Sequence, residues 1–365
     1  MNPVESDTAI EGHQQGQYPR SRKWEMGNEQ CNVCGKRRFE LIFQRIDFDV
    51  PTEEVFSIVK CKSCGLVFVY PQPTNESLGL HYPSNYYSYV SFGVLDRRAK
   101  FTSLVRLGAP GFRNQVSNPR RFIATLFYRL FSRIVTIIPY IPNSKLLDVG
   151  CGSGMFLWEM KGLGLDPYGV DIDTSAIAFA RSKGLKVYHG ELSECNFPDQ
   201  FFDVITLRSV IEHVRNPRRT LSEASRIIKK DGVLILNTPN ISSYEALLFG
   251  EYWSALETPR HLFLFNLQTL QELLSQCGFL LERVDWLAFT PDLFVKSLKN
   301  VKKFGRKSPV RILEIIFKWL ILQPVLCVAS KSKPSRYGSI LTVYARKRNT
   351  DHSDNKTALS AVPRT

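Results

Sequence analysis

The stretch Lys145–Gly154, with the sequence KLLDVGCGSG, constrains the fold of this chain more than any other. Apolar residues at 146, 147 and 149 follow the turn-forming residues Asn143 and Ser144, and this pattern predicts a short buried strand. Three glycines at alternate positions come next, followed by an apolar run of helix formers, Met155–Met160. Strand, glycine turn and helix open a nucleotide-binding α/β unit, because glycines let the backbone approach a ligand and the helix N-terminus offers free N–H groups.

The spacing within this loop separates two ligand classes. A dinucleotide fingerprint needs its third glycine where this chain has Met155. Asp148 stands two residues before the first glycine, and Asp171 ends the next apolar run, where it could accept both hydroxyls of a ribose. An anionic residue such as Asp148 suits a cationic ligand better than a pyrophosphate. S-adenosylmethionine combines a positive charge with an adenosine.

The residues Leu146–Gly154, with Gly169–Asp173, closely resemble the class I S-adenosylmethionine-dependent methyltransferases. The alternative is a strand–loop–helix unit of the same shape that only packs within the fold and binds no ligand. The resemblance implies cofactor contacts at successive strand tips: Asp148, Gly150, Gly152 and Gly154 at the methionine and sulfonium end, Asp171 and Ile172 at the ribose and adenine, and Glu191, Leu192 and Arg208 nearby. Glu191 stands where the family usually has an aspartate for the adenine amino group.

From Lys145 onward, strand-like and helix-like segments alternate. The predicted strands are 145–150, 167–172, 186–190, 202–207, 232–237, 280–286 and 340–345, and the predicted helices are 155–162, 174–183, 217–229 and 267–276. Right-handed crossovers and a final hairpin give an α/β fold with a Rossmann-like seven-stranded mixed sheet. The closing antiparallel strand is the methyltransferase feature that dehydrogenases lack.

Two C-x-x-C pairs precede this domain. Cys31 and Cys34 form the first pair, Cys61 and Cys64 the second, and a glycine follows each pair. Strand-like segments lie between and after them, so the pattern predicts a small N-terminal zinc ribbon with four thiolate ligands. Because four thiolates leave no open position, we expect the zinc to be structural; a redox role for either pair is the alternative.

The chain divides into six predicted segments. They are tails at 1–28 and 349–365 that we expect to be disordered, a zinc ribbon at 29–72, a connector with a helical cover at 73–140, a methyltransferase domain at 141–290 with 339–348, and a basic and apolar helical insert at 291–338. A helix at 122–138 either covers the sheet or lies on a membrane surface, and the insert is either a lid or a membrane contact. No apolar run has transmembrane length and no signal peptide is apparent, which predicts a cytoplasmic location, with membrane association left open.

The net charge of +14 is unevenly distributed. Basic residues concentrate after Lys296 and between Arg97 and Arg133, where no acidic residue occurs. Such flanks attract an anionic partner, which could be a membrane surface, a phosphorylated substrate or a nucleic acid. The alternative is a solvated face without a partner.

Two segments suggest the acceptor side. Arg208–Val214 resembles the Leu-Glu-His-Val pattern of the ubiquinone-biosynthesis O-methyltransferases, and Glu257–Asn266 resembles an Arg-His-x-x-x-Phe segment of similar bacterial enzymes. These resemblances imply His261, and second His213, as candidate catalytic bases, Arg260 as a partner for an anionic substrate group, and Tyr252 and Trp253 as pocket walls. Each histidine could instead support the loop structurally.

These observations predict a methyltransferase that uses S-adenosylmethionine and a structural zinc. The expected reaction is O-methylation of a small acceptor, a sugar or a lipid- or nucleotide-linked glycan precursor that could be anionic, with a peripheral membrane contact left open. One alternative is an RNA methyltransferase that uses the zinc ribbon and the basic flanks. The tetrapeptide typical of enzymes that methylate base amino groups is absent, so nucleic acid is not the expected partner. A non-catalytic cofactor-binding protein is the third hypothesis.

Overall fold

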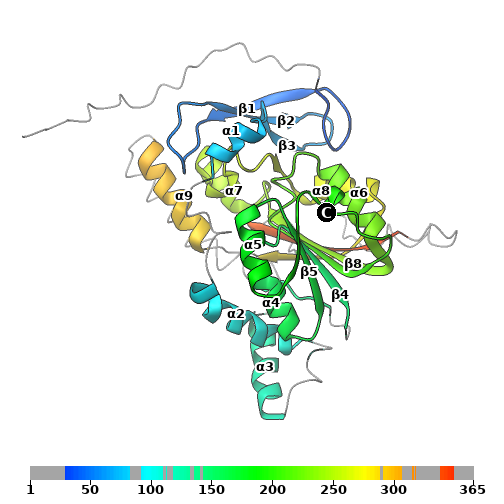
Figure 1. Cartoon of the computed structure of the whole chain (residues 1–365). Helices are drawn as coiled ribbons and strands as arrows, with labels where there is room; N and C mark the ends of the chain where they lie inside the picture. The colour runs from blue at the N-terminus through cyan, green and yellow to red at the C-terminus, as the bar shows by residue number, and fades with distance from the viewer. Residues whose placement is uncertain are drawn as a thin grey trace, which may run out of the picture.

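A computed structural model describes residues 29–82, 92–109, 112, 118–131, 135–139, 143–287, 291–305, 315, 317 and 338–348. The predicted tails and most of the predicted insert lie outside these residues. Two sheets form the framework, a seven-stranded central sheet and a four-stranded sheet above it (Figure 1).

The central sheet has the order β10-β11-β8-β7-β4-β5-β6. Its strands are β4 (Lys145–Val149), β5 (Asp166–Asp171), β6 (Lys186–His189), β7 (Phe202–Arg208), β8 (Ile228–Pro239), β10 (Phe279–Leu287) and β11 (Ile340–Lys347). The pairs among β4 to β8 are parallel, whereas β11 is antiparallel to both of its neighbours. The predicted seven-stranded mixed sheet is therefore confirmed, and β8 begins four residues earlier than its apolar run suggested.

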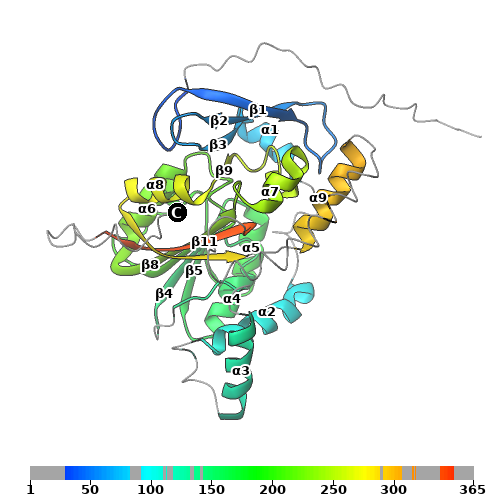
Figure 2. The same cartoon turned by 180° about the vertical axis from the view of Figure 1, so that it is seen from behind.

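Helices cover both faces of the central sheet (Figures 1 and 2). One face packs against α4 (Met155–Gly162) and α5 (Thr174–Ser182), and the other against α6 (Pro217–Ile227) and α8 (Leu267–Gln276). Adjacent residues of one strand enter different cores, as Leu146 and Leu147 do, because strand side chains alternate between faces. This arrangement leaves the carboxyl ends of the parallel strands open for loops, which is where ligands bind in such sheets.

The upper sheet contains the two cysteine pairs. Its strands are β1 (Phe39–Arg45), β2 (Phe56–Cys61), β3 (Val67–Tyr70) and β9 (Phe263–Leu264). The first three are the predicted ribbon, but β9 comes from the segment that follows β8 and pairs with Val67 and Phe68. The ribbon is consequently joined to the α/β domain through a shared sheet.

Strands β2 and β3 of the ribbon sheet are buried on both faces. Val59, Leu66 and Phe68 belong to the same apolar core as the central sheet and α8. Phe56, Ile58 and Val69 pack instead against α7 (Tyr244–Phe249), α9 (Pro291–Phe304) and the short 3-10 turns Gly250–Tyr252 and Ser254–Leu256. The remaining short elements are α1 (Asn75–Leu80) and the 3-10 turn Leu192–Glu194. The ribbon thus contributes to the core and is not a separate appendage.

Helices α2 (Phe92–Leu107) and α3 (Asn118–Phe131) form a pair at the end of the molecule far from the ribbon (Figures 1 and 2). Arg106 at the end of α2 forms a buried ion pair with Glu159 of α4 and donates to the Thr136 carbonyl, 3.1 Å away. The prediction that the helix beginning near Phe122, which is α3, runs to residue 138 is wrong, because residues 135–139 are not helical. Ile138 precedes Pro139, and a residue before proline disfavours the helical conformation. Among the described residues, no helix is long and apolar enough to cross a bilayer.

Candidate active site

The glycine loop joins β4 to α4 at the centre of the sheet. Gly150, Gly152 and Gly154 have φ values of 70°, 51° and 82°, a region that side chains disfavour. A Cβ atom at Gly150 would lie 2.4 Å from Val210 Cγ2, and one at Gly154 would lie 2.5 Å from Leu185 Cδ1. The loop therefore has no room for side chains at these two glycines, and its backbone is held against the segment that follows β7.

Asp171 closes the tip of β5 beside this loop. Its carboxylate accepts the Gly152 N–H at 2.7 Å and the Asp173 N–H at 2.9 Å. A carboxylate has about four acceptor positions, so about two stay available for the hydroxyls of a ribose. Burial raises the pKa of Asp171. Ile172 is 72% exposed and offers an apolar surface next to it, as an adenine contact requires.

Asp148 is fully buried and already has partners in the chain. Its carboxylate accepts from Thr206 Oγ1 at 2.6 Å and from Arg208 Nη2 at 3.0 Å. Thr206 lies opposite Asp148 on the neighbouring strand β7, and the Arg208 guanidinium also covers the Phe156 ring at 3.7 Å. Arg208, which is partly exposed, is thus the charged group of this pair that reaches the surface. Direct contact of Asp148 with a cofactor stays a prediction.

The loop after β6 holds two further predicted cofactor residues. Glu191 is the N-cap of the 3-10 turn Leu192–Glu194, where its side chain and that of Glu194 form reciprocal capping bonds. Leu192 is buried in the core. Glu191 is exposed, and its role at the adenine stays a prediction.

His213 and His261 are in ring contact, His213 in the segment that follows β7 and His261 in the segment that precedes β9. Their ring centroids are 4.6 Å apart, and the planes are nearly perpendicular. The Nδ1 atom of His213 lies 3.0 Å from the Arg260 carbonyl, and that of His261 lies 2.7 Å from the Ala255 carbonyl. Since a carbonyl only accepts, each Nδ1 carries the proton and each Nε2 keeps its lone pair. Burial lowers the pKa of both histidines to about 3, so both stay neutral at physiological pH.

Glu212 completes this cluster and was not among the predicted site residues. It is buried, and neither carboxylate oxygen has a hydrogen-bond partner. Burial raises its pKa to about 8. One ligand atom each from Glu212, His213 and His261 lie within 4.8 Å of one another. Two imidazole lone pairs with backbone-anchored rings, together with a carboxylate, form a donor set that suits a divalent cation.

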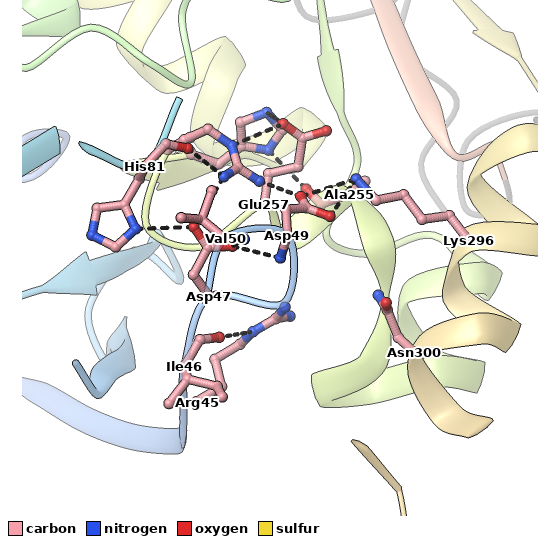
Figure 3. Close-up of polar contacts among 12 residues, drawn as sticks. Arg45, Ile46, Asp47, Asp49, Val50, His81, Ala255, Glu257, Lys296 and Asn300 are labelled. Carbon is pink, nitrogen blue, oxygen red and sulfur yellow. Dashed lines mark hydrogen bonds and ion pairs between the residues drawn. The ribbon is translucent and has the colours of Figure 1, made fainter. Parts of the chain in front are cut away.

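Arg260, predicted to bind a substrate anion, is 1% exposed and surrounded by carboxylates. Its guanidinium lies 3.0 Å from Asp47 Oδ2, pairs with Asp49 and donates to the His81 carbonyl at 2.7 Å. Asp47 also accepts from His81 Nδ1 at 2.9 Å, and Asp49 pairs with Lys296 of α9 (Figure 3). This cluster ties the ribbon loop to α9 and to the loop of His261, so a substrate role for Arg260 stays a prediction without support from its surroundings.

The predicted pocket walls are also buried. Tyr252 and Trp253 are 8% and 0% exposed, and both pack in the apolar cluster beneath the ribbon sheet. Contact with an acceptor stays a prediction for both.

The four ribbon cysteines converge on one point. Cys31 Sγ lies 3.5 Å from Cys64 Sγ, and Cys34 Sγ lies 3.6 Å from Cys61 Sγ. Gly35 and Gly65, with φ of 69° and 84°, close each turn by donating to the carbonyls of Cys31 and Cys61. Tetrahedral zinc with Zn–S distances of about 2.3 Å requires sulfur separations of about 3.8 Å. The arrangement therefore fits a four-sulfur metal site with little adjustment.

Sheet order, glycine loop and strand-tip acids together define a Rossmann-like class I methyltransferase fold. A family model described as a methyltransferase domain matches residues 119–284, which contain every predicted cofactor residue. Over these residues the chain is therefore similar to a methyltransferase domain.

Curated relatives agree with this class. The chain is 32% identical over 121 residues to a ubiquinone biosynthesis O-methyltransferase of Glaesserella parasuis, covering 30% of this chain and 51% of that protein. It is 30% identical over 139 residues to a probable S-adenosylmethionine-dependent methyltransferase of Mycolicibacterium smegmatis, covering 38% and 52%. The chain thus spans about half the length of these relatives. A solved methyltransferase of Archaeoglobus fulgidus superposes with a TM-score of 0.42 at 23% identity, covering 61% of this chain and 94% of that one.

Proposed function

We propose that this protein transfers the methyl group of S-adenosylmethionine to a hydroxyl of a small acceptor, a sugar or a lipid- or nucleotide-linked glycan precursor. The observation that carries methyl transfer is the glycine loop packed against Val210, with Asp171 and the exposed Ile172 beside it. O-methylation is favoured by the likeness to an enzyme named as an O-methyltransferase. The glycan class comes from the sequence resemblance alone.

The residues of the chain would divide the work between cofactor and acceptor. S-adenosylmethionine supplies an electrophilic methyl group when it is bound. Asp171 would hold the ribose through its available acceptor positions, and Arg208 would present charge at the other end of the loop. His261, neutral with a free Nε2 lone pair, would take the proton that the acceptor oxygen loses. Even a weak base suffices for this step, because an oxygen that has gained a methyl group and still carries its proton is a strong acid.

The acceptor can be identified by label transfer. The full-length protein would be incubated with methyl-labelled S-adenosylmethionine and a fractionated host extract. We expect label in a nuclease-resistant fraction of glycans or nucleotide sugars that phosphatase alters. Label in RNA would contradict the small-molecule proposal, and binding of the cofactor without any transfer would contradict catalysis.

The role of His261 can be separated from its structural contact. His261→Ala should abolish turnover and leave cofactor affinity intact, since the ring lies outside the glycine loop. His261→Asn is the matched control, because its amide can still donate to the Ala255 carbonyl but provides no base. We expect both variants to be inactive with unchanged cofactor affinity in equilibrium dialysis. Turnover retained by the asparagine variant would refute the base and leave only a positioning role.

We also propose that Cys31, Cys34, Cys61 and Cys64 hold one structural zinc ion. The sulfur separations and the two glycine turns support this assignment. Elemental analysis of freshly purified, reduced protein should give one zinc per chain. The Cys61→Ser variant should contain less zinc, and the fraction of chains without zinc should match the fraction that is misfolded. Metal-free wild-type protein that is fully folded would contradict it.

A further inference from the structure

Helix α3 presents large apolar side chains to solvent. Phe122 is 75% exposed, Ile123 49%, Leu126 46% and Leu130 63%. Their spacing places them in one stripe along the helix, because successive residues are rotated by about 100°. A stripe of this kind on the surface of a folded chain indicates a contact surface.

The opposite face of α3 is already used by the fold. Ala124 is buried, and its carbonyl oxygen would lie 1.9 Å from a Cβ atom at Gly108, so α2 and α3 are in close contact there. Phe127 and Phe131 pack edge-on against Phe101 of α2, with centroids 6.0 and 5.1 Å away. The helix is therefore anchored by its inner face, and α3 lies at the end of the molecule far from the ribbon (Figures 1 and 2).

The charges of α3 are all of one sign. The helix contains Arg120, Arg121 and Arg129 and no acidic residue. Arg120 and Arg129 are exposed. On a helical projection Arg129 borders one edge of the stripe, and Arg120 lies about 60° beyond the other edge, in the first turn of the helix. An apolar stripe on a helix whose charged residues are all basic is the arrangement of a helix that lies in a membrane interface.

We propose that α3 binds the surface of an anionic lipid bilayer. Phe122, Leu126 and Leu130 enter the boundary between headgroups and acyl chains, and Arg120 and Arg129 contact lipid phosphates. A second copy of α3 fits the stripe less well, because arginines would face arginines with no acid between them. RNA would pair with the arginines but gains little from the aliphatic side chains. The proposal concerns α3 alone and is independent of the acceptor chemistry.

Vesicle binding tests the proposal with the full-length protein. The probe is sedimentation with vesicles of phosphatidylcholine containing one third phosphatidylglycerol, and with phosphatidylcholine alone. We expect binding to the anionic vesicles that weakens as salt increases. Replacing Phe122 and Leu130 together by serine should lower the partition coefficient by about tenfold or more. Replacing Arg120 and Arg129 together by glutamine should lower it by about thirtyfold on anionic vesicles only.

A matched control uses apolar residues that are equally exposed elsewhere. Leu80 and Leu247 are 77% and 75% exposed, and neither lies on α3. Their double serine variant should bind vesicles like the wild type. No binding by the wild type, or equal losses in the control and in the α3 variants, would overturn the proposal. A dimer in sedimentation velocity that the Phe122 and Leu130 variant abolishes, without vesicle binding, would assign the stripe to a second copy instead, and binding to RNA alone would assign it to nucleic acid.

Discussion

Arg260 offers a direct test of how the ribbon is held on the methyltransferase fold. Its guanidinium is 1% exposed and joins Asp47 and Asp49 of the ribbon loop to the loop that carries His261. Removing one member of a buried ion pair leaves an uncompensated charge and costs about 3–5 kcal/mol. In Arg260→Met, Asp47 would keep the His81 imidazole and Asp49 would keep Lys296. We therefore expect the lower end of that range, a loss of about 3 kcal/mol in the free energy of unfolding.

The measurement is urea unfolding followed by tryptophan fluorescence and far-ultraviolet circular dichroism. The matched control is Arg226→Met, because Arg226 also pairs with two acids, Asp199 and Glu223, but is 39% exposed. Exposed pairs contribute about 0–1 kcal/mol, so the control should unfold close to the wild type. If Arg260→Met also unfolds within about 1 kcal/mol of the wild type, the buried cluster does not hold the two parts together.

A second variant separates lost charge from lost packing. Asp47→Asn keeps the volume of the side chain and removes its charge. Combined with Arg260→Met, it should recover part of the stability of the single variants, because neither charge is then stranded. Strictly additive losses would show that the two side chains act through separate contacts.

Three other predictions concern pH, metal and cofactor. Burial raises the pKa of Glu212 to about 8 and lowers those of His213 and His261 to about 3. Between about pH 6.5 and 8 the unfolded chain has lost the Glu212 proton that the folded chain keeps. In metal-free buffer the free energy of unfolding should therefore fall by about 2 kcal/mol as the pH rises through this range. The Glu212→Gln variant should not show this fall. Below about pH 6.5 the two histidines take up protons only in the unfolded chain, so stability should fall again toward low pH; a wild-type curve flat from pH 5 to 8 would contradict both shifts. Removal of the proposed zinc by a chelator should lower the thermal midpoint of the whole chain in one transition, because Cys31 and Cys61 share the core of the central sheet. A separate early transition would show that the ribbon folds alone. Gly150→Ala should weaken cofactor binding at least about tenfold, because the new methyl group would press on Val210. Gly184→Ala is the control and should bind normally, because Gly184 has a similar φ of 68° but open space around its Cβ. Equal affinities of the two variants in calorimetry would exclude the loop as the binding site.

The central sheet could be predicted because its signals are local. Each strand is an apolar run with turn residues at its end, and the glycine loop fixes where the first crossover begins. Elements that depend on such patterns differ from the prediction by a few residues at their ends, as β8 does by starting at Ile228. Helix caps explain part of the agreement, since Asn266 forms a capping box with Thr269 at the start of α8.

The acceptor side could not be predicted to the same depth because its contacts are remote in sequence. Strand β9 has two residues and no periodicity, and only its pairing with Val67 and Phe68 defines it. Arg260 follows a proline and precedes a histidine, which resembles a substrate-binding loop, yet its carboxylate partners lie in the ribbon. The isolation of Glu212 is likewise invisible in the sequence, because a lack of partners depends on everything packed around the side chain.

The geometry of the histidine pair depends on the ribbon through two separate routes. Phe263 in β9 pairs with the ribbon strand β3, and its N–H donates to the Glu212 carbonyl at 3.1 Å. Arg260 is fixed by Asp47, and its own carbonyl accepts the Nδ1 proton of His213. Ring orientation at His213 is thereby set from the ribbon side, whereas the glycine loop is set by the central sheet. Loss of the proposed ribbon zinc should consequently impair turnover more than cofactor binding. An equal loss of both would mean that the ribbon stabilises the chain without positioning the histidines.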